Sequence, residues 1–349
     1  MSDPPIAIIG AGRFARSVLR GITTALKGRV RAVLISRSPE SLREAVASLR
    51  DDGVALETEL IDPTSDSALR DWLAREQPPI VVNCASTYTP GTTSSPAGQL
   101  AAQGWFGATY PLQIQVASAV SAAISRANIP CTLINASYPD AVNQYLWRAN
   151  SSRVIGVGNG GSLMAWLVKT RGITPESFLL FGHVHLHHLP SAAPAPKLWT
   201  PGGRPIPIEA ILADWYQMSP AERNEWGGVH AGMLTAALLG AETPVQLIAP
   251  DGALGTSPGT IRAGKWALRE LPTMDAQEVA RWNRGCLEAE GLTETSSGLD
   301  FAMGLRHSAR ALGLPPLPPL DGPEAISEAQ DLLGHRLPEN HDQGLDHGS

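Results

Sequence analysis

A glycine-rich turn near the amino terminus is the first feature with a recognisable chemistry. Gly10, Gly12 and Ala15 form the pattern G-x-G-x-x-A, directly after the apolar run IAII and before a stretch with helical character. The first glycine permits a tight turn, the second lets the backbone approach a pyrophosphate, and the small third residue lets the helix pack on the sheet. The helix start favours phosphate through its free N–H groups. Since strand, turn and helix follow in order, we predict a dinucleotide site rather than a plain tight turn.

The end of the second expected strand indicates which dinucleotide binds. A site selective for NAD usually places Asp or Glu there to bind the ribose hydroxyls, whereas this chain has Ser36, Arg37 and Ser38. A guanidinium and two hydroxyls suit the 2′-phosphate of NADP(H), so we expect that cofactor, with a solvated loop arginine as the alternative. Asp62 ends the third expected strand and could accept from the adenine amino group or cap a helix. The expected cofactor site also includes Arg13, Phe14, Cys84, Ala85 and Ser86.

A histidine-rich stretch, HVHLHH, could supply a proton. On an extended strand His183, His185 and His187 would share one face, and His188 would lie on the other. One of them could be a general acid, since imidazole titrates near neutral pH. They could instead ligate zinc or be ordinary polar strand residues. We rank the acid role of His183 or His185 first and expect no metal, because no further ligand can be identified. His230 is a second acid candidate, or a capping or buried histidine.

The elements that must position these residues divide the chain into three parts. Over residues 1–160, strand-like and helix-like segments alternate, which predicts an α/β fold with a doubly wound parallel sheet of the Rossmann type. Residues 161–320 predict a mixed α+β domain, with a long strand over 178–188 and turns at Pro-Asp-Gly and Pro-Gly. The end of the chain is proline-rich and then polar, so we expect residues 321–349 to form a flexible tail.

A long loop separates two of the expected strands in the first part. Residues 87–111 are rich in Gly, Pro, Ser and Thr, a composition typical of lids and binding loops. The loop carries four aromatic residues, Tyr88, Trp105, Phe106 and Tyr110. These side chains could close over an apolar substrate, or they could anchor the loop to the body of the protein.

Composition and charge exclude several classes of protein. The 349 residues are 43% hydrophobic and carry a net charge of −6 without a basic block, which argues against binding to nucleic acid or to anionic membranes. No apolar run approaches the ~20 residues that span a bilayer, and the start MSDPPIAIIG lacks a secretion signal, so we expect a cytoplasmic protein. The three cysteines are widely spaced and form no CxxC motif, so they do not suggest a zinc or redox site.

Several segments resemble those of lactate and malate dehydrogenases. RVIGVGNGGSL resembles the segment after that family's Asn-Pro-x-Asp strand, LINASYPDAVNQYL occupies the place of that motif, and FLLFGHVH aligns with the strand of the catalytic histidine. AETPVQLIAPDGAL and the helix after it resemble the late hairpin and terminal helix. The resemblance covers most of residues 5–295 in fragments. It implies that His183 is the proton donor and that Asn135 or Ser137 contacts nicotinamide and substrate.

The family's charged substrate-binding residues are missing from this chain. By the same resemblance, the aspartate that pairs with the histidine would fall near Ser162 and the arginine that binds the substrate carboxylate near Ala165. The long loop has no counterpart of the family's polarising arginine. Since a carboxylate normally takes a bidentate arginine, a simple 2-oxo acid substrate is not supported. The nearest basic candidates are Arg148, Arg153, Lys169 and Arg171.

Together these features predict an NADP(H)-dependent oxidoreductase. It would transfer hydride to a C=O or C=N bond of a small or medium-sized metabolite, and we expect a homo-oligomer, with a homodimer as the working assumption. We place it in specialised metabolism as a hypothesis. One alternative is a reductase of the saccharopine or opine type, because the first 90 residues, especially PPIVVNCAS, are also similar to such Rossmann domains. The other is a dinucleotide-binding protein without hydride chemistry.

Overall fold

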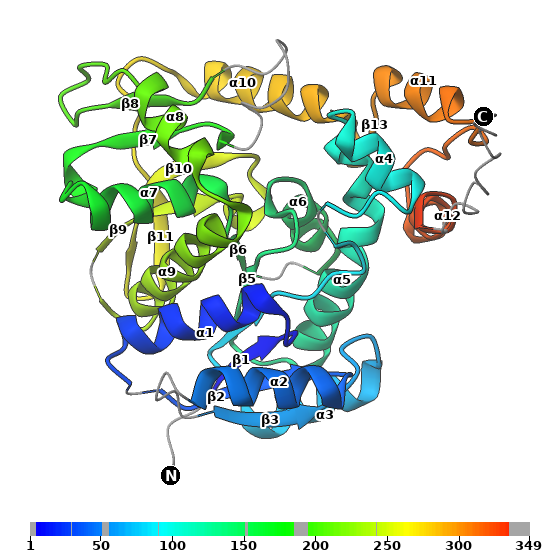
Figure 1. The fold of residues 1–349 in the computed structure, drawn as a ribbon, viewed down its shortest axis with the longest axis horizontal. Helices are drawn as coiled ribbons and strands as arrows, with labels where there is room; N and C mark the ends of the chain where they lie inside the picture. Colours follow the sequence, from blue (N-terminus) through cyan, green and yellow to red (C-terminus); the bar gives the residue numbers. More distant parts are fainter. Residues whose placement is uncertain are drawn as a thin grey trace, which may run out of the picture.

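One sheet forms the centre of the protein in the computed structural model, which describes residues 5–28, 30–50, 56–89, 91–150, 153–184, 195–241 and 243–334 (Figure 1). Its strand order is β11-β10-β9-β6-β5-β4-β1-β2-β3. The strands from β1 to β6 are parallel, which confirms the predicted doubly wound arrangement. They are β1 (Ile6–Ile9), β2 (Ala32–Ser36), β3 (Leu56–Leu60), β4 (Ile80–Asn83), β5 (Thr132–Asn135) and β6 (Val154–Gly156).

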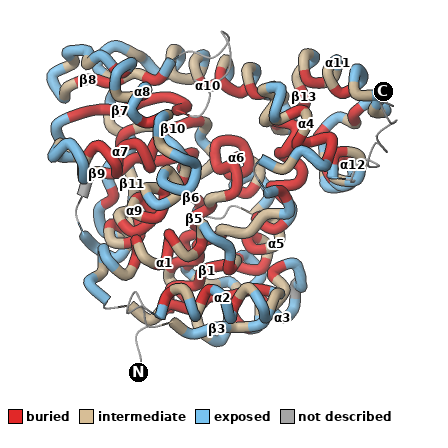
Figure 2. The backbone as a smooth tube through the Cα atoms, viewed as in Figure 1, coloured by how far each residue is buried: buried red, intermediate tan, exposed pale blue. Residues whose placement is uncertain are grey.

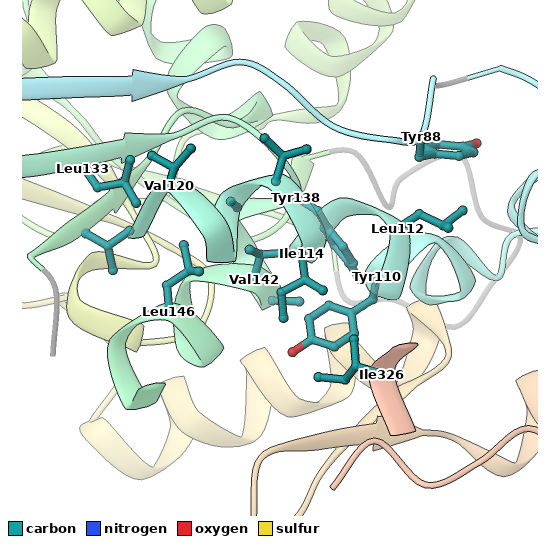
Figure 3. Packing of buried hydrophobic residues seen from close by; sticks show 14 of the residues in the cluster. Tyr88, Tyr110, Leu112, Ile114, Val120, Leu133, Tyr138, Val142, Leu146 and Ile326 are labelled. Atoms are coloured by element: carbon teal, nitrogen blue, oxygen red, sulfur yellow. The ribbon is translucent and has the colours of Figure 1, made fainter. Parts of the chain in front are cut away.

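Helices cover both faces of the parallel strands, because the apolar side chains of these strands point to both sides of the sheet. The first face packs on α1 (Arg13–Ala25), α2 (Pro39–Arg50) and α9 (Pro220–Leu238). The second face packs on α3 (Asp66–Glu76), α5 (Tyr110–Ala127) and α6 (Pro139–Asn150), and Figure 3 shows part of this cluster. The edge strand β3 is only partly covered.

The second half of the chain adds antiparallel strands to the same sheet. Gly156 of β6 pairs with Ile248 of β9, and the added strands are β9 (Thr243–Ile248), β10 (Thr256–Arg262) and β11 (Lys265–Leu268). The predicted Pro-Asp-Gly turn lies between β9 and β10. The predicted Pro-Gly turn is wrong, because both residues lie inside β10. Gly259 fits there since a Cβ would lie 2.1 Å from Cδ1 of Leu247.

The predicted long strand over 178–188 is also wrong. Strand β7 (Leu179–Phe181) pairs with β8 (Lys197–Trp199) and ends at Phe181, directly before Gly182. Gly182 has a φ of +113°, a conformation outside the extended region that other residues rarely adopt. The strand therefore does not continue into His183. His185, His187 and His188 lie outside the described residues, so the shared face expected for them has no structural support.

Helices α1 and α9 approach each other through glycines on the first face of the sheet. A Cβ on Gly21 would lie 1.8 Å from the carbonyl oxygen of Gly228, and a Cβ on Gly228 would lie 2.2 Å from that of Ser17. Gly232 makes a similar approach to the carbonyl oxygen of Gly21. Helix α7 (Asn159–Thr170) packs on the same helix α9. Backbone contact at this distance requires glycine on both helices.

The carboxyl-terminal elements run from the top of Figure 1 to its upper right, where the last of them pack beside the long loop. They are α10 (Ala276–Glu290), β12 (Leu292–Glu294), β13 (Leu299–Phe301), α11 (Met303–Ala311) and α12 (Pro323–Gly334). Residues 323–334 therefore differ from the expected flexible tail. They form a helix because Ile326, Ala329 and Leu333 bury one apolar face against the core cluster (Figure 2). The last fifteen residues of the expected tail lie outside the described part of the chain.

Candidate functional site

The carboxyl ends of the parallel strands form one continuous row across the sheet. Ile9 pairs with Ile35 on one side and with Asn83 on the other, Asn83 pairs with Asn135, and Asn135 pairs with Gly156. Ligands of open α/β sheets bind in the crevice outside such strand ends. The predicted cofactor residues follow these positions directly, so the fold brings most of them to one edge, which we call the strand-end edge.

The glycine turn at this edge has the geometry that a phosphate cradle requires. Gly10 has a φ of +102°, and a Cβ there would lie 3.2 Å from the backbone nitrogen of Ala85. Gly12 is exposed and precedes α1 without a side-chain cap, and a Cβ on it would meet no atom within 4 Å. The first turn of α1 carries no acidic residue. Its N–H groups are therefore open to an anionic ligand.

The residues after the turn divide between surface and core. Arg13 is exposed, whereas Ala15 is buried against the sheet. The ring of Phe14 lies over Gly227 of α9, where a Cβ would come within 2.7 Å of Cε2. A small residue at position 15 and a glycine at position 227 thus let α1 lie close to both the sheet and α9.

The end of β2 places an exposed arginine between two serines whose hydroxyls bond the local backbone. The Ser36 hydroxyl accepts from the backbone N–H of Ser38 at 3.2 Å, and the Ser38 hydroxyl accepts from that of Ser41 at 3.1 Å, which caps α2. Arg37 between them is exposed. Asp62 accepts from the Thr64 hydroxyl at 2.7 Å and from its N–H at 2.9 Å, and these bonds, with the charge of Arg37, lower the pKa of Asp62.

The residues after β4 lie against the glycine turn that precedes α1. Cys84, Ala85 and Ser86 are half-buried, and the Cys84 N–H donates to the carbonyl of Ile9. Burial raises the pKa of the Cys84 thiol to about 12, so it stays protonated at neutral pH. The Ser86 hydroxyl bonds both backbone groups of Tyr88. These residues shape the edge and start the long loop.

Asn135 is the centre of a buried amide network. Its Oδ1 accepts from Asn83 Nδ2 and from the backbone of Ser137, both at 3.1 Å, and its Nδ2 donates to Asn143 Oδ1 at 2.9 Å. Asn143 in turn donates to the carbonyl of Ala249 at 3.1 Å. Asn83, Asn135 and Asn143 have no exposed surface. The Asn135 amide therefore joins the ends of β4, β5 and β9, and its expected contact with nicotinamide stays a prediction.

His183 lies at the end of β7, under the turn that leads into β10. It is 1% exposed, and its backbone is hydrogen-bonded to the thiol of Cys286 in α10. Gly255 leaves room for its ring, because a Cβ there would lie 2.9 Å from His183 Nε2 and 2.3 Å from Asn283 Oδ1. The structure thus places an amide oxygen of α10 beside the imidazole. The acid role of His183 is not tested by these contacts and stays a prediction, and His185 lies outside the described residues.

The second histidine candidate is buried between three elements. His230 of α9 has no exposed surface, its Nε2 lies 2.9 Å from the carbonyl of Gln246 in β9, and a Cβ on Gly161 of α7 would lie 2.0 Å from its ring. A carbonyl only accepts, so Nε2 carries the proton. Burial lowers the pKa of His230 to about 4, so the ring is neutral near neutral pH. These contacts give it a packing role, and its role as an acid stays a prediction.

The low pKa of His230 predicts loss of stability in acid. The folded pKa is about 4 and the ordinary value is 6.5, so the unfolded chain binds more protons between these limits. The free energy of unfolding should therefore fall as the pH drops through this window, by about 3 kcal/mol at most. Chemical denaturation at a series of pH values measures this. His230→Gln keeps a donor for Gln246 and should flatten the profile, whereas His307→Gln, at an exposed site, should leave it unchanged.

The aromatic residues of the long loop anchor it to the body. Tyr88 and Tyr110 are buried, and the ring of Phe106 meets that of Tyr138 edge-on at 4.9 Å. Trp105 packs over Gly304, where a Cβ would lie 2.6 Å from its ring. The loop contains α4 (Pro96–Ala102) and contacts α11 and α12. Of the two alternatives, this structure shows the anchored one.

A tyrosine and a glutamate far apart in sequence meet beside the strand-end edge. The Tyr138 hydroxyl donates to the Glu290 carboxylate, and both residues are buried. Burial and the nearby carboxylates of Glu290 and Asp140 raise the pKa of Tyr138 well above its ordinary value. Sequence reasoning missed this pair, because its members lie on α10 and before α6 with no local pattern linking them. It also missed Asn83, although a polar residue ending an apolar strand in register with Asn135 was a usable signal.

The basic residues named as substitutes for the family's arginines have different surroundings. Arg171 pairs with Asp214 and lies over the ring of Trp166, and Arg153 lies 4.5 Å from the ring centre of Trp266. Lys169 is in the last turn of α7.

The two positions where the resemblance implies charged residues carry none. The Ser162 hydroxyl donates to the carbonyl of Gly158, and Ala165 is buried. Among the described residues, no cluster of three His, Cys, Asp or Glu side chains could hold a metal ion.

Comparison with known proteins finds solved structures of similar fold. No family model matches the sequence, and neither does any curated protein. The structure is similar to apo malate dehydrogenase from Picrophilus torridus, with a TM-score of 0.53 and 12% identity over 82% of this chain and 95% of that one. It is similar to a minor L-lactate dehydrogenase from Enterococcus mundtii, with a TM-score of 0.51 and 16% identity over 81% and 95%. These matches confirm the predicted likeness to the lactate and malate dehydrogenase fold.

A third solved structure also has a similar fold. Lactate dehydrogenase from Eimeria maxima, solved with NADH and oxamate, has a TM-score of 0.50 and 13% identity over 82% of this chain and 92% of that one. Within the described ranges, none of the helices is both long and apolar enough to span a bilayer.

Proposed function

We propose that the protein is an NADP(H)-dependent oxidoreductase that reduces a C=O or C=N bond of a small or medium-sized metabolite. The observation that carries this proposal is the open glycine turn before α1, where Gly12 has no neighbour and the helix start has no side-chain cap. The fold supports it, since the Eimeria maxima enzyme of similar fold was solved with NADH. A bound nicotinamide would supply the hydride.

The chain's own residues would bind, orient and protonate. The N–H groups at the start of α1 bind the pyrophosphate, and Arg37 binds the 2′-phosphate. His183 donates the proton that completes reduction, and Asn283 lies beside its Nε2. The buried amide network around Asn135 fixes the strand ends against which the nicotinamide would rest.

Arg37 should make the protein prefer NADPH over NADH. A charge-assisted bond to the 2′-phosphate contributes about 1.5–3 kcal/mol, or roughly ten- to a hundredfold in affinity. Titration of both reduced cofactors by nicotinamide fluorescence measures this preference. Arg37→Ala should weaken NADPH binding by that factor and leave NADH binding unchanged, and Arg43→Ala, an exposed change on α2, serves as the control. Equal affinities of the unmodified protein for both cofactors would contradict the assignment.

A second candidate is a dinucleotide-binding protein without hydride chemistry. It is favoured by the positions of Ser162 and Ala165, where the dehydrogenases of similar fold are expected to carry charged residues, and by the full internal use of the Asn135 amide. Oxidation of NADPH in the presence of a panel of carbonyl and imine compounds separates the two. Turnover with any of them excludes this candidate.

A further inference from the structure

A cavity of about 420 Å³ lies between α6, the turn from β9 to β10, and α10. We call it the α6–α10 groove. Its walls include Gln144, Trp147 and Arg148 from α6, Leu254 from the turn, and Asn283 and Arg284 from α10. Its size falls within the range of small-molecule sites, which is roughly 300–1,000 Å³.

Two arginines give the groove a positive charge in an otherwise acidic protein. Arg148 lies on one wall and Arg284 on another, both are exposed, and neither forms an ion pair within the described part of the chain. The one acid in the walls, Glu294, accepts a hydrogen bond from Gln144 at 3.2 Å. The walls therefore carry one net positive charge, which matches one negative charge on a ligand. Guanidinium groups favour carboxylate and phosphate oxygens.

The remaining walls are apolar and include an exposed tryptophan. Trp147 is 46% exposed and Leu268 is 53% exposed, and both line the groove. Gly252 lies against the Trp147 side chain, where a Cβ would be 3.1 Å from its Cβ atom. Trp147 and Leu268 thus offer apolar surface in the same groove as the two arginines. A flat apolar body could lie along the indole while an acidic group meets the arginines.

The groove is held open by buried hydrogen bonds rather than by loose surface side chains. Asn283 is 4% exposed, and its Nδ2 donates to the carbonyl of Leu254 at 2.7 Å. Asn143 donates to the carbonyl of Ala249, and Trp266 donates to Asp251 at 3.0 Å. The turn from β9 to β10 is thus fixed at both ends and in its middle. A preformed wall reduces the entropy lost on binding.

We propose that the α6–α10 groove binds a small aromatic carboxylate. Arg148 and Arg284 hold the carboxylate, and Trp147 and Leu254 hold the ring. A monoanion fits better than a phosphate dianion, because Glu294 leaves a single net positive charge in the walls. The groove shares Gly255 and Asn283 with the surroundings of His183, and it uses none of the residues proposed to bind the cofactor.

Calorimetric titration of the full chain with 1-naphthoate tests the proposal, with neutral 1-naphthamide as the matched probe. The carboxylate should bind, and the amide should bind at least about tenfold more weakly, the size of one charge-assisted bond. Arg148→Ala and Arg284→Ala should each weaken 1-naphthoate by a similar factor. Arg281→Ala, an exposed change on α10 outside the groove, should bind like the unmodified protein.

Three results would overturn the proposal: no heat of binding at millimolar 1-naphthoate, equal binding of the amide, or tighter binding of 1-naphthyl phosphate. Circular dichroism and melting temperature show whether each variant is folded. Arg37→Ala should bind 1-naphthoate normally, so failure of the cofactor assignment and failure of this one are distinguishable.

Discussion

His183→Asn is expected to slow reduction of the substrate by about 10²–10⁴-fold, the usual contribution of a general acid. Asparagine is polar and smaller than histidine, so it should fit beside Gly255 without displacing the turn into β10. It cannot deliver a proton at the same position. The affinity for NADPH should not change, because His183 is on β7's end and not on the glycine turn.

The measurement is the single-turnover rate of NADPH oxidation with a substrate found by screening carbonyl and imine compounds. His307→Asn, at an exposed site on α11, is the matched control and should keep the full rate. Full activity of His183→Asn would reject a dehydrogenase-type proton transfer. Tyr138, whose hydroxyl donates to Glu290 beside the strand-end edge, would then be the next candidate for the proton donor.

Gly12→Val should abolish NADPH binding while leaving the fold intact. The side chain has free space in the protein, since a Cβ at Gly12 meets nothing within 4 Å. The same space is where the pyrophosphate must approach the N–H groups of α1. The variant should show an unchanged circular dichroism spectrum and no rise in melting temperature on addition of NADPH.

Gly322→Val is the control for this variant. Gly322 also directly precedes a helix, accepts from the N–H four residues later as Gly12 does, and has nothing within 4 Å of a Cβ. It lies far along the chain from the glycine turn, so its valine variant should keep the cofactor-induced shift. A normal shift in Gly12→Val would show that the turn before α1 does not hold phosphate.

The parallel half of the fold was predictable because its strands are short, apolar and separated by helices with clear periodicity. IAII and IVVN could only be buried on both sides, and the glycine turn fixed the first crossover. The errors came from tertiary packing. Gly182 ends β7 through a positive φ that the residue type permits but does not require, and Gly259 is a strand residue because Leu247 takes the place of its side chain.

The candidate site was predictable only where its residues follow strand ends. Ser36, Arg37 and the glycine turn reach the edge through the register of neighbouring strands, which sequence order already implies. The neighbours of His183 could not be inferred, because Asn283 and Cys286 come from a helix one hundred residues later. The end of the chain was misjudged for a similar reason. The proline-rich composition led to the prediction of a flexible tail. The apolar face of α12 becomes evident only in the structure, where the core cluster covers it.

The glycine contacts between α1 and α9 limit how the two halves of the chain can move. Because β6 is bonded to β9 and the helices touch through their backbones, opening a cleft between the halves would break a sheet and separate two close-packed helices. Enzymes that close by rotating one domain on another need an interface that slides or hinges. In this protein, α1 and α9 should instead exchange their amide hydrogens as one cooperative unit. A ligand would then reach the exposed glycine turn without rotation of one half of the chain on the other.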